Sequence, residues 1–357
     1  MKCVCFFVFL FFYSLTGIAK NITWRDECIG YYQLQIPDNL DVGIYPSNRT
    51  YTKDLAMSSI FTEQKKSPGK TRIVKGRYSN FYYKKYKILI SENGFFNIES
   101  YKEKVIKKIA EQGDVFHIKK YSSDAFFISH EESHSLYIQA GHRLYQFMKG
   151  NNDLFRLGDN GYLSNESGVL SLLNNFQARA LYDVPTERGF CLPYGFISHD
   201  SGKEDRNIIV SYRMLAHPDV MIVFQDASFQ LPYMVPRNND LSTVKDYDAK
   251  DYAKWLWNHI YMLYPNQERK LLWPRWFTVK MDGRKGVGSF LEVTKENGEN
   301  DYGYLAFVRG NPNNLIEEPD LQVFVSSVSD IAEGHPRMTP DELKALAEHI
   351  VNSVKHR

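Results

Sequence analysis

The segment His130-Glu-Glu-Ser-His134 carries the residue types of a metal-dependent hydrolase. In zinc peptidases the H-E-x-x-H pattern lies on a helix, where both imidazoles reach one metal ion and the glutamate activates a water molecule. Here the flanking runs 125–129 and 136–140 predict two strands, so the motif falls in a hairpin connection. An exported metallohydrolase using His130, Glu131 and His134 is therefore an alternative and not the leading prediction.

Cys28 and Cys191 are the second kind of residue that could do chemistry, because they are the only cysteines outside the apolar N-terminus. In an oxidising compartment they could form a disulfide. The chain-entropy argument gives about 5 kcal/mol for closing a loop of that length. Two buried free thiols, one in each half of the chain, are the other interpretation. The residues alone leave both open.

The N-terminus has the pattern of a secretory signal. Lys2 precedes an apolar run over residues 3–15, which is shorter than the roughly 20 residues that span a bilayer. Gly17 and Ala19 supply the small residues that signal peptidase accepts. We therefore predict a signal peptide at 1–19, cleaved after Ala19, and an exported mature protein.

Length and composition predict a globular protein of two domains. The chain has 357 residues, of which 43% are hydrophobic and 24% charged. Its 44 basic and 42 acidic side chains nearly cancel, so charge alone indicates no nucleic-acid partner. Pro185 ends a predicted helix, which places the boundary between an N-terminal domain at 20–184 and a C-terminal domain at 185–357.

Hydrophobic periodicity predicts an α+β fold in which each half is a mainly antiparallel sheet with packed helices. In the first half we expect strands at 28–36, 115–121, 125–129, 136–140 and 144–148, and helices at 97–112 and 166–181. In the second half we expect strands at 190–197, 208–212, 220–225, 271–280, 290–294, 302–308 and 321–328, and a helix at 249–263. Thr339 and Glu342 form a capping box at the start of a closing helix that runs to residue 354.

The stretch 65–87 holds nine basic and no acidic residues, interleaved with tyrosine and phenylalanine. Such a mixture can bind anionic lipid, glycan or an acidic protein. Besides the metallohydrolase, a second alternative is thus an envelope lipid- or glycan-binding protein. A basic strand pair that simply faces solvent is the structural alternative.

Several segments, taken in order, resemble the immunity proteins that neutralise phospholipase (lipase-class) effectors of the type VI secretion system. The opening Cys28-Ile-Gly-Tyr-Tyr-x-Leu-x-Ile-Pro37 is similar to that family's first strand. The segment from Glu187 to Ile197 is similar to the start of its C-terminal domain, and the closing helix also matches. The chain departs from the pattern at Tyr31, where a basic residue is expected, and over 65–87.

The resemblance implies a periplasmic protein that binds a cognate phospholipase effector and occludes its lid or active-site entrance. Such an inhibitor needs no catalytic residue, cofactor or nucleic acid, and would meet the membrane only through its signal sequence or by weak surface contact. Exposed connections are the expected contact sites. Our candidates are Glu131, Glu132, Met234, Arg237 and Asn238.

Overall fold

The computed structural model describes residues 22–45, 59–60, 75–76, 79–94, 97–111, 113, 115–130, 133–149, 166–229, 248–259, 267–332 and 334–357. The predicted signal peptide at 1–19 lies outside these ranges, as do the contact candidates Glu131, Glu132, Met234, Arg237 and Asn238. Those assignments stay predictions. Within the described ranges no helix is both long enough and apolar enough to cross a bilayer.

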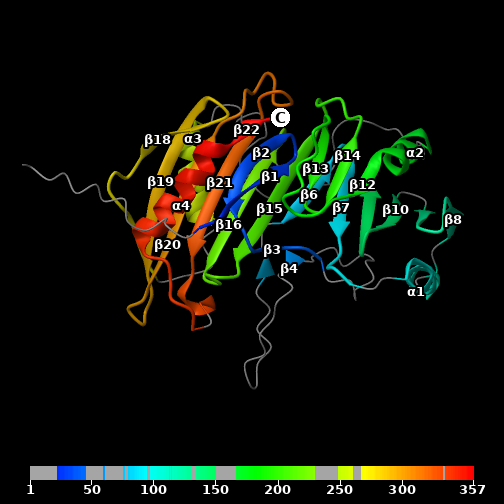
Figure 1. Ribbon diagram of the computed structural model, residues 1–357, viewed down its shortest axis with the longest axis horizontal. Helices are drawn as coiled ribbons and strands as arrows, with labels where there is room; N and C mark the ends of the chain where they lie inside the picture. Colours follow the sequence, from blue (N-terminus) through cyan, green and yellow to red (C-terminus); the bar gives the residue numbers. More distant parts are fainter. Residues whose placement is uncertain are drawn as a thin grey trace, which may run out of the picture.

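A 14-stranded sheet runs along the whole molecule (Figure 1). Each pair of neighbouring strands in it is antiparallel. From one edge to the other the strands are β17 (Glu268–Leu271), β19 (Arg284–Thr294), β20 (Asn300–Val308), β21 (Asp320–Ser327), β16 (Val220–Ala227), β15 (Arg206–Met214), β6 (Asn80–Tyr83), β7 (Tyr86–Ile90), β11 (Arg143–Lys149), β10 (Ser133–Ala140), β9 (Ala125–His130) and β8 (Phe116–Lys120), with β18 (Phe277–Met281) beside β19 and β3 (Leu40–Val42) beside β15.

Three smaller sheets and the helices complete the fold. The small sheets are β1 (Trp24–Ile29), β2 (Tyr32–Pro37) and β22 (Lys355–His356); β12 (Phe176–Ala178), β14 (Gly195–Ser198) and β13 (Gly189–Leu192); and β4 (Ser59–Ile60) with β5 (Lys75–Gly76). The helices are α1 (Ile98–Glu111), α2 (Glu166–Asn175), α3 (Ala249–His259) and α4 (Pro340–Ser353), with a 3-10 turn, η4, at Ser329–Ile331.

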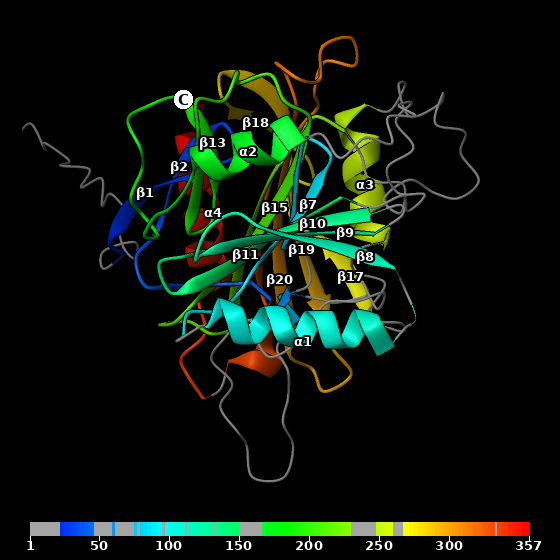
Figure 2. The same cartoon turned by 90° about the vertical axis from the view of Figure 1, so that its right-hand side faces the viewer.

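Helices cover both faces of the large sheet (Figure 2). Helix α4 begins at the predicted capping box of Thr339 and Glu342, and its apolar stripe joins the main core. That core also takes residues from α2 and from the hairpins β1–β2 and β13–β14. Helices α1 and α3 bury separate clusters against the other face, because alternate residues of each strand point to opposite sides.

The α+β class and the antiparallel pairing are confirmed, but the sheets of the two halves are joined. Strand β15 of the second half pairs with β6 of the first, with Arg206 opposite Tyr83 and Ile209 opposite Asn80. The chain termini also mix, since C-terminal strand β22 pairs with β2 near the N-terminus. The domain boundary near 184–188 stays a prediction, and the structure shows how closely the halves are tied.

Both cysteine segments form hairpins, whereas the sequence predicted one strand in each. The first turns at Gly30 and Tyr31 between β1 and β2, and the second at Pro193 and Tyr194 between β13 and β14. Each turn holds a residue with positive φ, +60° at Gly30 and +63° at Tyr194. Alternating apolar residues predict extended backbone on both sides of such a turn, so they do not reveal the reversal.

Two other element predictions were too long. The helix predicted at 166–181 ends at Asn175, where β12 begins and pairs with β14. The strand predicted at 271–280 is divided into β17 and β18 by residues 272–276. In both places apolar residues continue across the junction because each following segment also packs on a buried surface, and periodicity alone does not mark the change.

The aromatic residues at the end of the basic stretch do not face solvent. Phe81, Tyr82, Tyr83 and Tyr86 are all buried in β6 and β7, at the centre of the large sheet. In this part the aromatic side chains are buried, whereas the basic side chains of Lys84 and Lys85 are exposed. Residues 65–74 and 77–78 lie outside the described ranges.

Candidate functional site

One end of the large sheet gathers the connections predicted to contact a partner. The interstrand register carries a single row across it, through Ser135, Met148, Lys87, Tyr82, Asn207, Ala227 and Asp320. Past this row the strands end at Tyr83, His130, Lys149 and Ala227, or begin at Tyr86, Ser133, Arg206 and Asp320. Of the connections at these strand ends, the structure describes 84–85, 199–205, 228–229 and 309–319. We call this end of the sheet the loop edge.

The strand ends that precede the two sets of contact candidates, His130 of β9 and Ala227 of β16, lie at the loop edge, and the candidates themselves are outside the described residues. Glu131 and Glu132 connect β9 to β10, while Met234, Arg237 and Asn238 follow β16. Five interstrand steps separate β10 from β16, which corresponds to about 24 Å at the usual strand spacing. The sequence could not predict this common edge, because it depends on how the halves pair at β6 and β15.

Two connections of the loop edge dock on each other. Lys203 of the 199–205 connection forms an ion pair with Glu317 of the 309–319 connection, at 3.0 Å. Arg206 also donates from Nη1 to the carbonyl of Ile316 at 3.0 Å. In Figure 1 the orange 309–319 connection lies at the top of the sheet. These contacts fix the connections that flank the start of β15.

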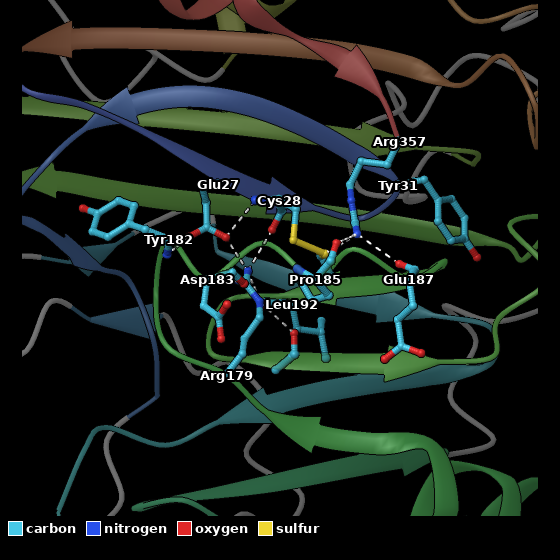
Figure 3. Close-up of a disulfide and its surroundings, with 12 residues drawn as sticks. Glu27, Cys28, Tyr31, Arg179, Tyr182, Asp183, Pro185, Glu187, Leu192 and Arg357 are labelled. Carbon is cyan, nitrogen blue, oxygen red and sulfur yellow. Dashed lines mark hydrogen bonds and ion pairs between the residues drawn. A yellow bond between two sulfur atoms is a disulfide. The ribbon is translucent and has the colours of Figure 1, made fainter.

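A disulfide lies beneath the loop edge, where the two halves meet (Figure 3). Cys28 of β1 and Cys191 of β13 are bonded, with their Cα atoms 5.7 Å apart. Beside the bond, Gly30 and Cys191 exchange two backbone hydrogen bonds of 2.9 and 3.0 Å. The two hairpins that hold the cysteines, β1–β2 and β13–β14, are therefore linked both covalently and through the backbone. We call this contact between the hairpins the junction.

A buried ion pair joins the same hairpins. Glu27 is completely buried, and its carboxylate accepts from Arg179, from the backbone N–H of Cys28 and from that of Tyr182. Arg179 also donates to the carbonyls of Cys28 and Leu192, both at 2.9 Å (Figure 3). Because these hydrogen bonds offset the cost of removing both charges from water, the pair fixes the junction.

The C-terminal residue closes the junction from above. The Arg357 guanidinium lies 2.8 Å from Cys191 Sγ and donates to the carbonyls of Pro185 and Glu187. Its pKa is lowered from the ordinary value, mainly by burial. Arg357 therefore contacts the disulfide directly and ties the end of the described chain to the residues around Cys191.

A second buried ion pair connects the junction to the loop edge. Arg206 donates from Nε to Asp226 Oδ2 at 2.7 Å, and both side chains are completely buried. The guanidinium carbon lies 4.5 Å from the centre of the Tyr31 ring. The resemblance leads one to expect a basic residue at position 31. Here that position is Tyr31, and the positive charge beside it comes from Arg206.

Asp200 belongs to the 199–205 connection and links it to Tyr31 and Tyr83. We call these three residues the Asp200 cluster. Asp200 accepts hydrogen bonds from the hydroxyls of Tyr31 and Tyr83 and from the backbone N–H of Gly202. Burial, with the negative charge of Asp200, raises the pKa of both phenols far above the usual value. Both hydroxyls stay protonated and donate, so they hold the connection in place.

The H-E-x-x-H motif lies in a hairpin, as the sequence predicted. Ser133 is opposite His130, and His134 is opposite Ser129. The His134 ring packs 5.3 Å from that of Phe127 and 5.8 Å from that of Tyr86, and burial lowers its pKa to about 4. His134 is thus a neutral ring in an aromatic setting. The described residues contain no group of metal-ligating side chains.

Part of the chain is similar in sequence to a known protein family. Residues 183–239 match the profile of the Tle cognate immunity protein 4 C-terminal domain. That segment includes β13, β14, β15 and β16, which build the junction and part of the loop edge. No curated protein matches the chain.

Solved structures match along nearly the entire chain. The immunity protein TplEi of the type VI secretion system from Pseudomonas aeruginosa, complexed with a peptide, aligns with a TM-score of 0.55 at 14% identity. The alignment covers 94% of this chain and 98% of that one. The Tle4–Tli4 complex aligns with a TM-score of 0.56 at 14% identity, over 94% of this chain and 97% of the other.

The structural matches establish the shared fold. The profile match adds a similarity in sequence over the segment that contains β13, β14, β15 and β16. Together they confirm the resemblance that the cysteine segments indicated. The chain is similar to the immunity proteins of the type VI secretion system, and its residues 183–239 match the C-terminal domain of Tle cognate immunity protein 4.

Proposed function

We propose that this chain is an immunity protein that binds a phospholipase effector of the type VI secretion system. It inhibits the effector by covering the lid or the active-site entrance. It carries out no reaction of its own, so it needs neither catalytic residues nor a cofactor.

The observation that carries the proposal is the position of the profile match. Residues 183–239 form the strands at the junction and lead into the connection that holds Met234, Arg237 and Asn238. The similarity in fold to a chain of the Tle4–Tli4 complex extends the argument to both halves. An inhibitor that contacts an effector through both halves requires that the halves keep a fixed relative position, and the Cys28–Cys191 bond and the β6–β15 pairing link them.

The physical case rests on preorganisation. Ordering loops during binding costs free energy, so a surface that is already held in place binds more tightly. At the loop edge, the Asp200 cluster and the hydrogen bond from Arg206 to the carbonyl of Ile316 hold two connections before any partner arrives. A standard interface buries about 800 Å² on each partner, so we expect binding to use more than one connection of this edge.

The experiment is an inhibition assay with the cognate phospholipase effector. Glu131→Arg, Glu132→Arg and Arg237→Glu should each weaken inhibition, by about thirtyfold at a central position of the interface. Asp124→Arg is the matched control, because Asp124 is exposed and precedes β9, whereas residue 131 follows the other end of that strand. If the wild-type chain leaves the effector fully active, the proposal fails.

We further propose that the protein works in the periplasm after loss of residues 1–19. The signal pattern around Lys2 and Ala19 supports this, and an oxidising compartment suits the Cys28–Cys191 bond. Mass analysis of the protein from a periplasmic fraction should give an N-terminus at Lys20. An intact N-terminus in the cytoplasmic fraction would contradict it.

A further inference from the structure

Trp273 is exposed to an unusual degree. Its relative exposure is 90%, whereas the other four tryptophans of the chain, Trp24, Trp255, Trp257 and Trp276, are buried or half-buried. Tryptophan carries a large apolar area that proteins normally cover. Its position on the outside needs a reason other than folding.

The local structure holds Trp273 at the outer edge of the large sheet. Residues 272–276 connect β17 to β18, and both strands pair with β19, the last long strand on this side. The neighbouring Trp276 packs into the α3 cluster and anchors the connection. Pro274 and Arg275 are exposed like Trp273, so the three residues protrude from the edge.

Basic side chains lie along the same outer edge of the sheet as this protrusion, towards the turn that joins β18 to β19. Lys280 and Lys285 lie directly opposite each other on β18 and β19, and both are exposed. Strand alternation places them on the face that α3 covers, because Val287 on the same side of β19 packs against the α3 cluster. On that face Lys250 of α3 lies 5.6 Å from the Trp276 ring.

This arrangement costs stability and therefore indicates a binding role. Like charges directly opposite each other in a sheet are destabilising. Within the part of the chain that the structure describes, Lys280, Lys285 and Arg275 have no carboxylate partner. Unneutralised cations spread along the same sheet edge as an exposed tryptophan fit an extended anionic surface.

We propose that Trp273, Arg275, Lys250, Lys280 and Lys285 form a patch that binds an anionic phospholipid surface. Tryptophan favours the boundary between lipid headgroups and acyl chains, where its ring is buried and its N–H stays hydrated. Lysine and arginine beside it attract anionic headgroups. A protein interface would surround the tryptophan with other apolar side chains, whereas here its exposed neighbours are Pro274 and Arg275.

The patch lies at the opposite edge of the sheet from β8 and is separate from the Asp200 cluster. A molecule attached through it would leave the junction free. The inference is independent of the proposed function, because lipid binding requires no effector.

Vesicle sedimentation tests the patch with the full mature protein. The probes are vesicles of phosphatidylglycerol mixed with phosphatidylcholine, and vesicles of phosphatidylcholine alone. We expect binding to the anionic vesicles at low salt, loss of that binding at high salt, and little binding to neutral vesicles. Lys280→Glu with Lys285→Glu should weaken binding at least about tenfold.

Two further variants separate the tryptophan from the charges. Trp273→Ala should weaken binding about tenfold, and Trp273→Phe should remove the blue shift of tryptophan emission that vesicles cause in the wild type. Lys104→Glu with Lys107→Glu on α1 makes the same charge change elsewhere and should bind normally.

The proposal is overturned if the wild type fails to bind anionic vesicles, or if the patch variants bind them as well as the wild type does. Patch variants that keep vesicle binding but lose capture of the effector would identify a protein interface in its place.

Discussion

At the scale of single residues, the junction depends on charges removed from water. Arg179 and Glu27 are both buried, and each satisfies several backbone groups as well as the other. Removing one partner leaves an uncompensated buried charge, which costs far more than the pair contributes. Arg179→Met should therefore lower the free energy of unfolding by about 3–5 kcal/mol in urea denaturation.

Lys254→Met is the control for that measurement. Lys254 pairs with Asp251 on the exposed face of α3, where water screens both charges. This variant should unfold at the wild-type urea concentration. Equal effects of the two substitutions would show that the Glu27–Arg179 pair does not hold the junction.

Gly30 provides a second prediction at this scale. Its φ is +60°, and a Cβ there would lie 2.2 Å from Asp226 Oδ2, the atom that Arg206 binds. Gly298 has φ of +80° with no atom within 4 Å of an added Cβ. Gly298→Ala should cost about 1–2 kcal/mol through backbone strain alone. Gly30→Ala should cost clearly more in the same thermal or urea unfolding experiment, and equal costs would contradict the close approach to Asp226.

At the scale of elements, the hairpin β9–β10 carries the histidine that the sequence analysis considered as a metal ligand. Burial lowers the pKa of His134 to about 4, below its ordinary value of 6.5. The unfolded chain binds a proton at this residue as pH falls below about 6.5, whereas the folded protein does so only near 4. His134 thus lowers stability progressively as the pH falls between those values.

His134→Phe removes that titration while keeping an aromatic ring. Urea unfolding at about pH 7 and about pH 4.5 should show a smaller loss of stability on acidification for the variant than for the wild type. The same substitution at the exposed His117 serves as control for replacing a histidine by phenylalanine. A variant that loses as much stability as the wild type would contradict the buried, neutral ring.

The disulfide acts between elements, since it links hairpin β1–β2 to hairpin β13–β14. Its loop spans a sequence separation of 163, for which the chain-entropy argument gives about 5 kcal/mol. Replacing both cysteines by alanine should lower the free energy of unfolding by up to that amount in urea. A reducing agent should have the same effect on the wild type and none on the variant, and a wild type insensitive to reduction would contradict the bond's role.

At the scale of the whole molecule, the sequence predicted the class of the fold better than its connectivity. Helix α4 and strands β9, β10 and β11 follow from local patterns, because capping residues and alternation determine them. The pairing of β15 with β6 brings together residues far apart in the chain, and no local pattern encodes it.

The candidate site shows the same division. The sequence identified Cys28 and Cys191 but left their bonding open, because bonding depends on how the hairpins pack. It did not single out Glu27, Arg179, Arg206 or Asp226, since a buried ion pair looks like any surface charge until the fold buries it. Trp273 was missed for the opposite reason, as a tryptophan next to strands predicts burial.

The most direct test of the proposed function is co-purification of the mature chain with its cognate phospholipase effector, followed by a lipase assay on the purified fraction. The two proteins should elute as one stable complex, and lipase activity should fall to background at equal molar amounts. Separate elution with full lipase activity, from a chain that still unfolds cooperatively, would contradict the proposal.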